Sequence, residues 1–262
     1  MLFKRELKRN LKSFIISVTI CCILVMYVIS IAPTFGSDIQ KILDMKLPQQ
    51  MQTAMGLIGL NYKDPISFYC LVFSYVYLFF SIYVAGIFAT IVSKEFSDKT
   101  AEFLFSLPAK RIQIIRIKLS VALLYTGLSV LIIFLVSWIS FVLFVAGSYD
   151  MKPVVLMSVA WLLGGLAFGS MAFLVSSYLI KSRAASTTSI GIILIMYMMQ
   201  VVISLKGKLD FLKYISPFDW FKGSEIASSG GLSATYCLIA LFFIIVFFIT
   251  GIRRFNKMDV LI

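Results

Sequence analysis

The fold is decided by residues 93–118, SKEFSDKTAEFLFSLPAKRIQIIRIK, a charged stretch between two long apolar runs. It contains six of the 24 basic residues and three of the 12 acidic residues of the chain. The runs on either side, residues 65–92 and 119–149, contain no Asp, Glu, Lys or Arg. Because charged side chains are costly in hydrocarbon, this stretch is expected to lie in water beside a membrane.

Within this stretch, a helix with about 100° per residue places two groups of side chains on opposite faces. The apolar face contains Phe96, Phe103 and Leu107, and the acidic face contains Glu95, Asp98 and Glu102. Residues 94–107 are therefore predicted to form a short amphipathic helix at the membrane surface. Pro108 ends that helix and suits the first position of the next one, which carries Arg111 toward the bilayer.

The composition is typical of a membrane protein, and the sequence has none of the common motifs for catalysis or nucleotide binding. Of the 262 residues, 60% are hydrophobic and 14% are charged, against roughly a quarter charged in soluble domains. Histidine is absent and the four cysteines lie in apolar runs, so the sequence predicts no metal site and no Ser-His-Asp site. It also has no GxxxxGK[ST] phosphate loop, so nucleotide binding by that route is excluded. The net charge of +12 is read as a sign of topology, not of nucleic-acid binding.

Six apolar runs are long enough to cross a membrane, which takes about 20 helical residues. They span residues 13–35, 68–92, 119–146, 154–180, 184–205 and 234–252. The predicted fold is therefore all-α, with residues 1–262 forming one polytopic membrane domain. None of the six runs contains an ionisable Asp, Glu, Lys or Arg, which argues against a carrier driven by an ion gradient.

Basic residues indicate the orientation of these spans. Segments 1–12, 93–118, 181–183 and 253–262 together contain 16 of the 24 Lys and Arg residues. By the positive-inside rule they are cytoplasmic, as are both ends of the chain, whereas loops 36–67 and 206–233 and the turn 147–153 are outside. Residues 1–12 form a basic amphipathic helix at the inner surface. A cleaved signal peptide is not expected, because the apolar run that follows is too long.

Several residues in the loops and spans predict contacts with other parts of the protein or with the membrane surface. The middle of loop 36–67 repeats apolar residues every three or four positions, which predicts a helix on the outer surface. In loop 206–233, four rings at 214–221 predict an interfacial aromatic group, and part of the loop can dip back into the protein. Gly165-x-x-x-Gly169 allows close approach of two helices. Gln200 is the only Asn or Gln in the six runs, and it is expected to face protein, a cavity or a second copy of the chain, or to form an ordinary interhelical hydrogen bond.

Residues 93–118 resemble the loop between spans two and three in the membrane permease subunits of type 2 ATP-binding-cassette exporters. The matching positions are Glu95, Thr100, Glu102, Leu104, Pro108, Arg111 and Lys118. Lys99 stands where the family commonly has glycine. The resemblance extends to SSYLIKSRAA at 176–185, which is similar to the end of span four, and to ISPFDWF at 215–221, which is similar to the motif before span six.

The resemblance implies a permease in a bacterial plasma membrane that works as a dimer, with an identical or a different permease, on a separate cytoplasmic ATPase. The ATPase would bind ATP and Mg, and this chain would bind no cofactor. Residues 1–12 would be the connecting helix, and residues 94–107 the coupling helix that docks on the ATPase. The residues implied to act in coupling are Glu95, Phe96, Asp98, Thr100, Glu102, Phe103, Leu107, Pro108 and Arg111.

By the same resemblance, spans two and five line the export pathway. The implied lining residues are Tyr75, Phe79, Tyr83, Met196, Met199 and Gln200, although ordinary helix packing also explains such side chains. A pathway of this kind suits an amphipathic or apolar substrate, such as a peptide, an antimicrobial or a lipid-like molecule. The alternative function is a membrane scaffold or immunity protein that binds a partner without transport.

Overall fold

The computed structural model describes residues 2–46, 64–97, 111–145, 149–179, 181–206 and 213–256. Of these residues 92% are helical and none lies in a strand. Six of the helices are long and apolar enough to cross a membrane. The predicted all-α class with six spans is therefore confirmed.

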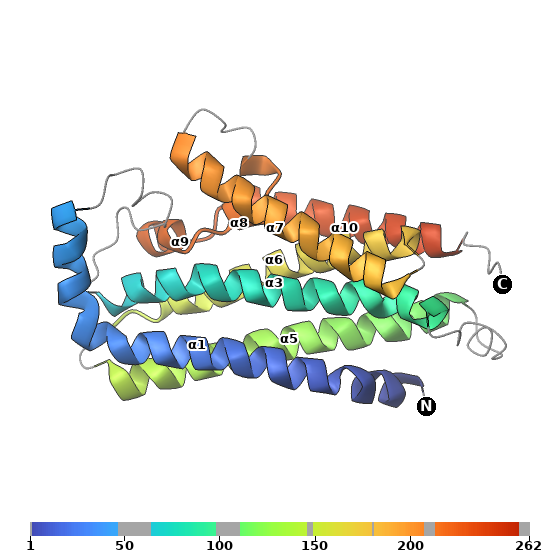
Figure 1. Ribbon diagram of the computed structural model, residues 1–262, viewed down its shortest axis with the longest axis horizontal. Helices are drawn as coiled ribbons and strands as arrows, with labels where there is room; N and C mark the ends of the chain where they lie inside the picture. Colours follow the sequence, from blue (N-terminus) through green and yellow to red (C-terminus); the bar gives the residue numbers. More distant parts are fainter. Residues whose placement is uncertain are drawn as a thin grey trace.

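The helices follow the labels in Figure 1. Their bounds are α1 Leu2–Lys46, α3 Pro65–Ser97, α5 Arg111–Phe144, α6 Lys152–Tyr178, α7 Ser182–Lys206, α8 Pro217–Trp220, α9 Gly223–Ser229 and α10 Ala234–Asn256. The start of α1 and the end of α10 lie at the same end of the bundle (Figure 1), as an even number of spans requires. The end of α3 and the start of α5 lie there too, so residues 98–110 connect the two helices at that end.

The first helix differs from the prediction. A surface helix over 1–12 and a separate span over 13–35 were expected, but α1 is continuous from Leu2 to Lys46. No proline or glycine interrupts the sequence before Pro33, so nothing breaks the helix at residue 12. Pro33 lies inside the helix and removes a backbone hydrogen bond, which accounts for the sharp change of direction in Figure 1. The predicted outer helix of loop 36–67 overlaps the last part of α1; residues 47–63 lie outside the described part.

The core of the bundle is the pair α3 and α6. In their most hydrophobic windows 61% and 67% of the residues are buried, against 17% to 33% for the other four spans. Gly164, Gly165 and Gly169 of α6 face the rings of Tyr77, Phe80 and Phe88 of α3. A Cβ atom at Gly164 would lie 1.6 Å from Tyr77 Oη. The predicted small-residue contact is therefore made inside the chain, where it lets α3 and α6 approach closely.

The segment between α7 and α10 enters the protein. Phe218 of α8 is 2% exposed, and its ring packs against Tyr77, Phe168 and Tyr197 at centroid distances of 5.0, 4.7 and 5.6 Å. Tyr77 Oη donates a hydrogen bond to the Pro217 carbonyl at 3.1 Å. The prediction that this loop can dip back is confirmed. The predicted interfacial group of four rings is wrong for Phe218, Trp220 and Phe221, which are buried, whereas Tyr214 is exposed.

Candidate functional site

The structure describes the two borders of the charged stretch 93–118 but not its centre. The helix α3 continues past the predicted end of its span at residue 92 and includes Glu95 and Phe96. After the link, α5 begins at Arg111. The other coupling residues lie outside the described part, namely Asp98, Thr100, Glu102, Phe103, Leu107 and Pro108. Residues 94–97 are the end of α3 and not the start of a separate helix, so the separate surface helix over 94–107 stays a prediction.

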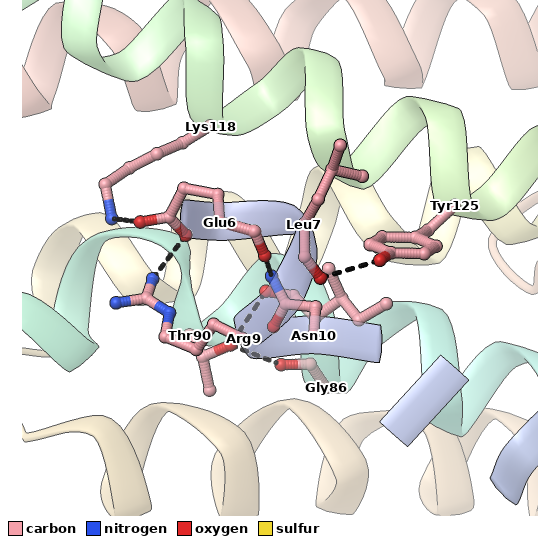
Figure 2. A network of polar contacts seen from close by, with 9 residues as sticks. Glu6, Leu7, Arg9, Asn10, Gly86, Thr90, Lys118 and Tyr125 are labelled. Atoms are coloured by element: carbon pink, nitrogen blue, oxygen red, sulfur yellow. Dashed lines mark hydrogen bonds and ion pairs between the residues drawn. The ribbon is translucent and has the colours of Figure 1, made fainter. Parts of the chain in front are cut away.

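A buried ionic cluster lies beside the start of α5. Glu6 of α1 and Lys118 of α5 are 3% and 4% exposed, and Lys118 Nζ is 3.2 Å from Glu6 Oε1. The other carboxylate oxygen of Glu6 is 2.5 Å from Arg9 Nη2. Figure 2 shows both cations directed at this one carboxylate. Buried charges are retained when they are paired and hydrogen-bonded, so the cluster fixes the first turns of α1 against α5.

A second contact joins α1 and α5 nearly two turns further along α5. Tyr125 Oη donates a hydrogen bond to the Leu7 carbonyl at 2.7 Å (Figure 2), and the Tyr125 ring lies 4.8 Å from the ring of Phe14. Asn10 Nδ2 donates to the Glu6 carbonyl at 3.2 Å. The side chains of Lys118 and Tyr125 therefore connect α5 to α1 at two levels.

This cluster was missed by the reading of the sequence, which treated residues 1–12 as a surface helix. Two signals were available. Glu6 is the only acid among the first 12 residues, surrounded by five basic ones, and Lys118 borders a long uncharged run. Neither signal identifies the partner, because the two residues are 112 positions apart in the chain.

The predicted pathway residues of α3 separate into two groups. Tyr75 and Phe79 are 49% and 50% exposed on one face of the helix, whereas Tyr83 is 7% exposed and belongs to the core. A step of four residues turns about 40° around a helix, so the position eight residues beyond Tyr75 has rotated away from that face. The partly exposed residues continue instead through Ile82, Gly86 and Thr90. We call Tyr75, Phe79, Ile82, Gly86 and Thr90 the α3 stripe.

The predicted residues of α7 lie beside the buried loop. Met196, Met199 and Gln200 are all partly exposed. Gln200 Nε2 donates a hydrogen bond to the Phe218 carbonyl at 3.4 Å, and Ser216 Oγ donates to the Met196 carbonyl at 3.3 Å. Gln200 therefore connects α7 to α8 through this hydrogen bond, and its place in a pathway stays a prediction.

One further ion pair stabilises the buried loop at the opposite end of the bundle from Glu6. The carboxylate of Asp219 is fully buried, and Lys222 Nζ lies 2.8 Å from its Oδ1 atom. Burial raises the pKa of the Asp219 carboxyl above its usual value, and the nearby Lys222 ammonium opposes that shift. Among the described residues, no group of three or more His, Cys, Asp or Glu side chains could hold a metal ion. The described side chains thus offer an uncharged stripe and two ion-paired anchors.

Comparison with known proteins gives a match over nearly the whole chain. The family model described as "ABC-2 family transporter protein" matches residues 1–260. No curated protein matches the chain.

Proposed function

Because this chain belongs to the ABC-2 transporter family, a family of membrane permeases that is generally non-catalytic, we propose that it is the permease subunit of an exporter driven by a separate cytoplasmic ATPase. The end of the bundle that holds both termini would face the cytoplasm. Residues 94–107 would dock on the ATPase, and two permeases would pair to enclose the pathway.

The observation that carries this proposal is the buried cluster of Glu6, Arg9 and Lys118. It lies directly after the link 98–110 and joins α5 to α1. The other border of the link is the unbroken helix α3, which is packed along α6. A force applied to the link would therefore move α1, α3 and α5 together, which is what a coupling site requires.

The α3 stripe supports the assignment of a pathway. It leaves an exposed face on a span that is otherwise largely buried, and its side chains are aromatic, aliphatic, small or hydroxylic, with no charge. In a dimer with this face turned inward, the cavity would suit an amphipathic or apolar substrate. ATP binding would draw the two ATPases together, and the bundles would rock between inward-facing and outward-facing states.

Charge reversal at the proposed docking site tests the coupling. The chain is coexpressed with the ABC ATPase encoded next to it, and the double variant Glu95→Lys with Glu102→Lys is compared with the unchanged chain. We expect the variant to insert normally but to lose the copurified ATPase or its stimulation, because an acidic face of the docking helix becomes basic.

The matched control is Asp150→Lys, a charge reversal of an exposed residue in the turn between α5 and α6. It should leave ATPase association unchanged. If the double variant retains both ATPase binding and ATP-driven flux in vesicles, residues 94–107 are not the coupling site. If no ATPase copurifies and no ATP-driven flux appears for the unchanged chain, the scaffold function replaces the permease proposal.

A further inference from the structure

A hollow with both polar and apolar lining residues lies beside α9 and the start of α10. Figure 1 shows α9 at the end of the bundle far from the N-terminus. The volume of the hollow is about 510 Å³, within the range of roughly 300–1,000 Å³ that small-molecule sites occupy. Six of its lining residues bear on what it could bind, namely Trp220, Lys222, Glu225, Ser228, Ser233 and Tyr236. It is separate from the α3 stripe and from the Glu6 cluster.

The hollow contains one positive and one negative side chain that do not pair with each other. Lys222 is held in place by Asp219, and its ammonium has further N–H groups to donate. Glu225 is exposed, and no ion pair with another residue in the described part of the chain holds its carboxylate. A ligand with one anionic and one cationic group would therefore satisfy both.

The remaining lining favours a cation beside Glu225. Trp220 and Tyr236 present aromatic rings, and each ring is fixed by a neighbour: Trp220 stacks on Phe243 at 5.7 Å, and Tyr236 packs on Tyr214 at 6.2 Å. Aromatic rings next to a carboxylate attract organic ammonium groups. The hydroxyl oxygens of Ser228 and Ser233 add acceptors for the N–H groups of a primary ammonium.

The surroundings indicate that the ligand comes from the membrane. Tyr214 and Tyr236 are aromatic residues of the kind that is typical of the headgroup level of a bilayer, and neither ring is fully buried. From the hollow, α10 continues through the apolar region with Leu238, Phe242 and Ile245 exposed. Acyl chains could lie along that surface while a headgroup fills the hollow.

We propose that this hollow binds a phospholipid with a primary ammonium headgroup. The ammonium would contact Glu225, Ser228 and Ser233, the phosphate would accept from Lys222, and the acyl chains would lie along α10. This site is independent of the proposed ATPase docking, so either proposal can fail without the other.

The test is lipid binding to the purified full-length chain, counted by native mass spectrometry. The probes are phosphatidylethanolamine, phosphatidylcholine and phosphatidylglycerol with identical acyl chains. We expect the ethanolamine lipid to bind most tightly, and Glu225→Gln to weaken its binding by about tenfold, the loss of one charge-assisted contact. Asp150→Asn, the same neutralisation at an exposed site away from the hollow, should leave binding unchanged.

A second variant separates headgroup recognition from folding. Ser233→Ala, at an exposed position, should weaken binding of the ethanolamine lipid but not of the choline lipid, which has no N–H group. Equal affinity for the two zwitterionic lipids, or an ethanolamine affinity that Glu225→Gln leaves unchanged, would overturn the proposal. Binding of a lysine-containing peptide that depends on Glu225, without such lipid binding, would assign the hollow to a peptide and overturn the lipid.

Discussion

Glu6 is the residue on which the N-terminal end of the bundle depends. Its buried carboxylate accepts contacts from Arg9 and Lys118, one on each oxygen. Removing one cation and removing the acid have different effects, because Glu6 keeps one ion pair when either cation is removed. Removing the acid breaks both ion pairs at once, and it does so beside the buried ammonium of Lys118. Breaking a buried ion pair by removing one partner is strongly destabilising.

We therefore predict that Glu6→Gln destabilises the chain more than Lys118→Met does. Breaking a buried ion pair by removing one partner costs about 3–5 kcal/mol, and Met preserves the apolar length of the lysine side chain. The measurement is the temperature of unfolding of the purified protein in detergent. Lys8→Gln, an exposed site on the same helix, should have no effect. A Glu6→Gln variant as stable as the Lys8 control would show that the cluster contributes nothing to the fold.

A second residue-scale prediction concerns the contact between α3 and α6. Gly164→Ala should lower the unfolding temperature strongly, because the added Cβ would lie 1.6 Å from Tyr77 Oη and 2.5 Å from its ring carbon Cζ. Gly191→Ala on α7 is the control, since nothing lies within 4 Å of its added Cβ. That variant should gain up to about 1 kcal/mol from helix propensity. Equal effects of the two substitutions would contradict the close packing.

At the scale of elements, α3 has two different faces. One face meets α6 through Tyr77, Phe80 and Phe88. The other is the α3 stripe, which has Tyr75 and Phe79 half exposed. The adjacent residues Phe79 and Phe80 therefore lie on different faces of α3. They give a matched pair for an accessibility experiment.

We predict that Phe79→Cys reacts quickly with a water-soluble maleimide in membranes, and that Phe80→Cys does not. Phe79 is 50% exposed and Phe80 is 1% exposed. If the α3 stripe lines an aqueous pathway, substrate should also protect the cysteine at 79. Labelling of position 79 only after solubilisation would place the stripe against lipid or another chain, and would remove its assignment to a pathway.

The elements were predictable to different degrees. Apolar length identified all six spans, because a helix must bury its backbone polar groups in a membrane. Helix ends were not predictable in this way: α3 continues to Ser97 and α1 to Lys46, since backbone hydrogen bonding does not stop where hydropathy falls. The buried position of α8 depends on contacts from Tyr77 and Gln200, which no local pattern specifies.

At the scale of the whole molecule, the contacts that matter most join distant parts of the sequence. Glu6 and Lys118 are 112 residues apart, and Tyr77 and Pro217 are 140 apart. The sequence alone indicated that a charged link follows the second span, but not which residues fasten its border. It also named Tyr83 with Tyr75 and Phe79, because periodicity does not show how a helix is rotated in the bundle.

The arrangement of the ends gives a prediction about topology. The start of α1 and the end of α10 lie at one end of the bundle (Figure 1), and the basic residues favour the cytoplasm for that end. A protease site added before Met1 should be cut only from the inner side of sealed vesicles. One inserted at Gly230, a turn residue with φ of 63° after α9, should be cut only from the outer side. Cleavage of the first site only from the outer side, and of the second only from the inner side, would show that both ends of the chain face the exterior.

The continuity of α1 has a mechanical consequence. The part of α1 from Glu6 to Pro33 spans 27 helical steps and is roughly 40 Å long at about 1.5 Å per step. A tilt of about 5° at its foot therefore displaces its upper end by about 3.5 Å, more than the diameter of a water molecule. If α1 tilts as one rigid helix, a small movement that the proposed ATPase imposes at its cytoplasmic end becomes a larger movement at its other end. Two adjacent glycines placed midway along this part of α1 should therefore uncouple ATP hydrolysis by the proposed ATPase from opening of the proposed pathway.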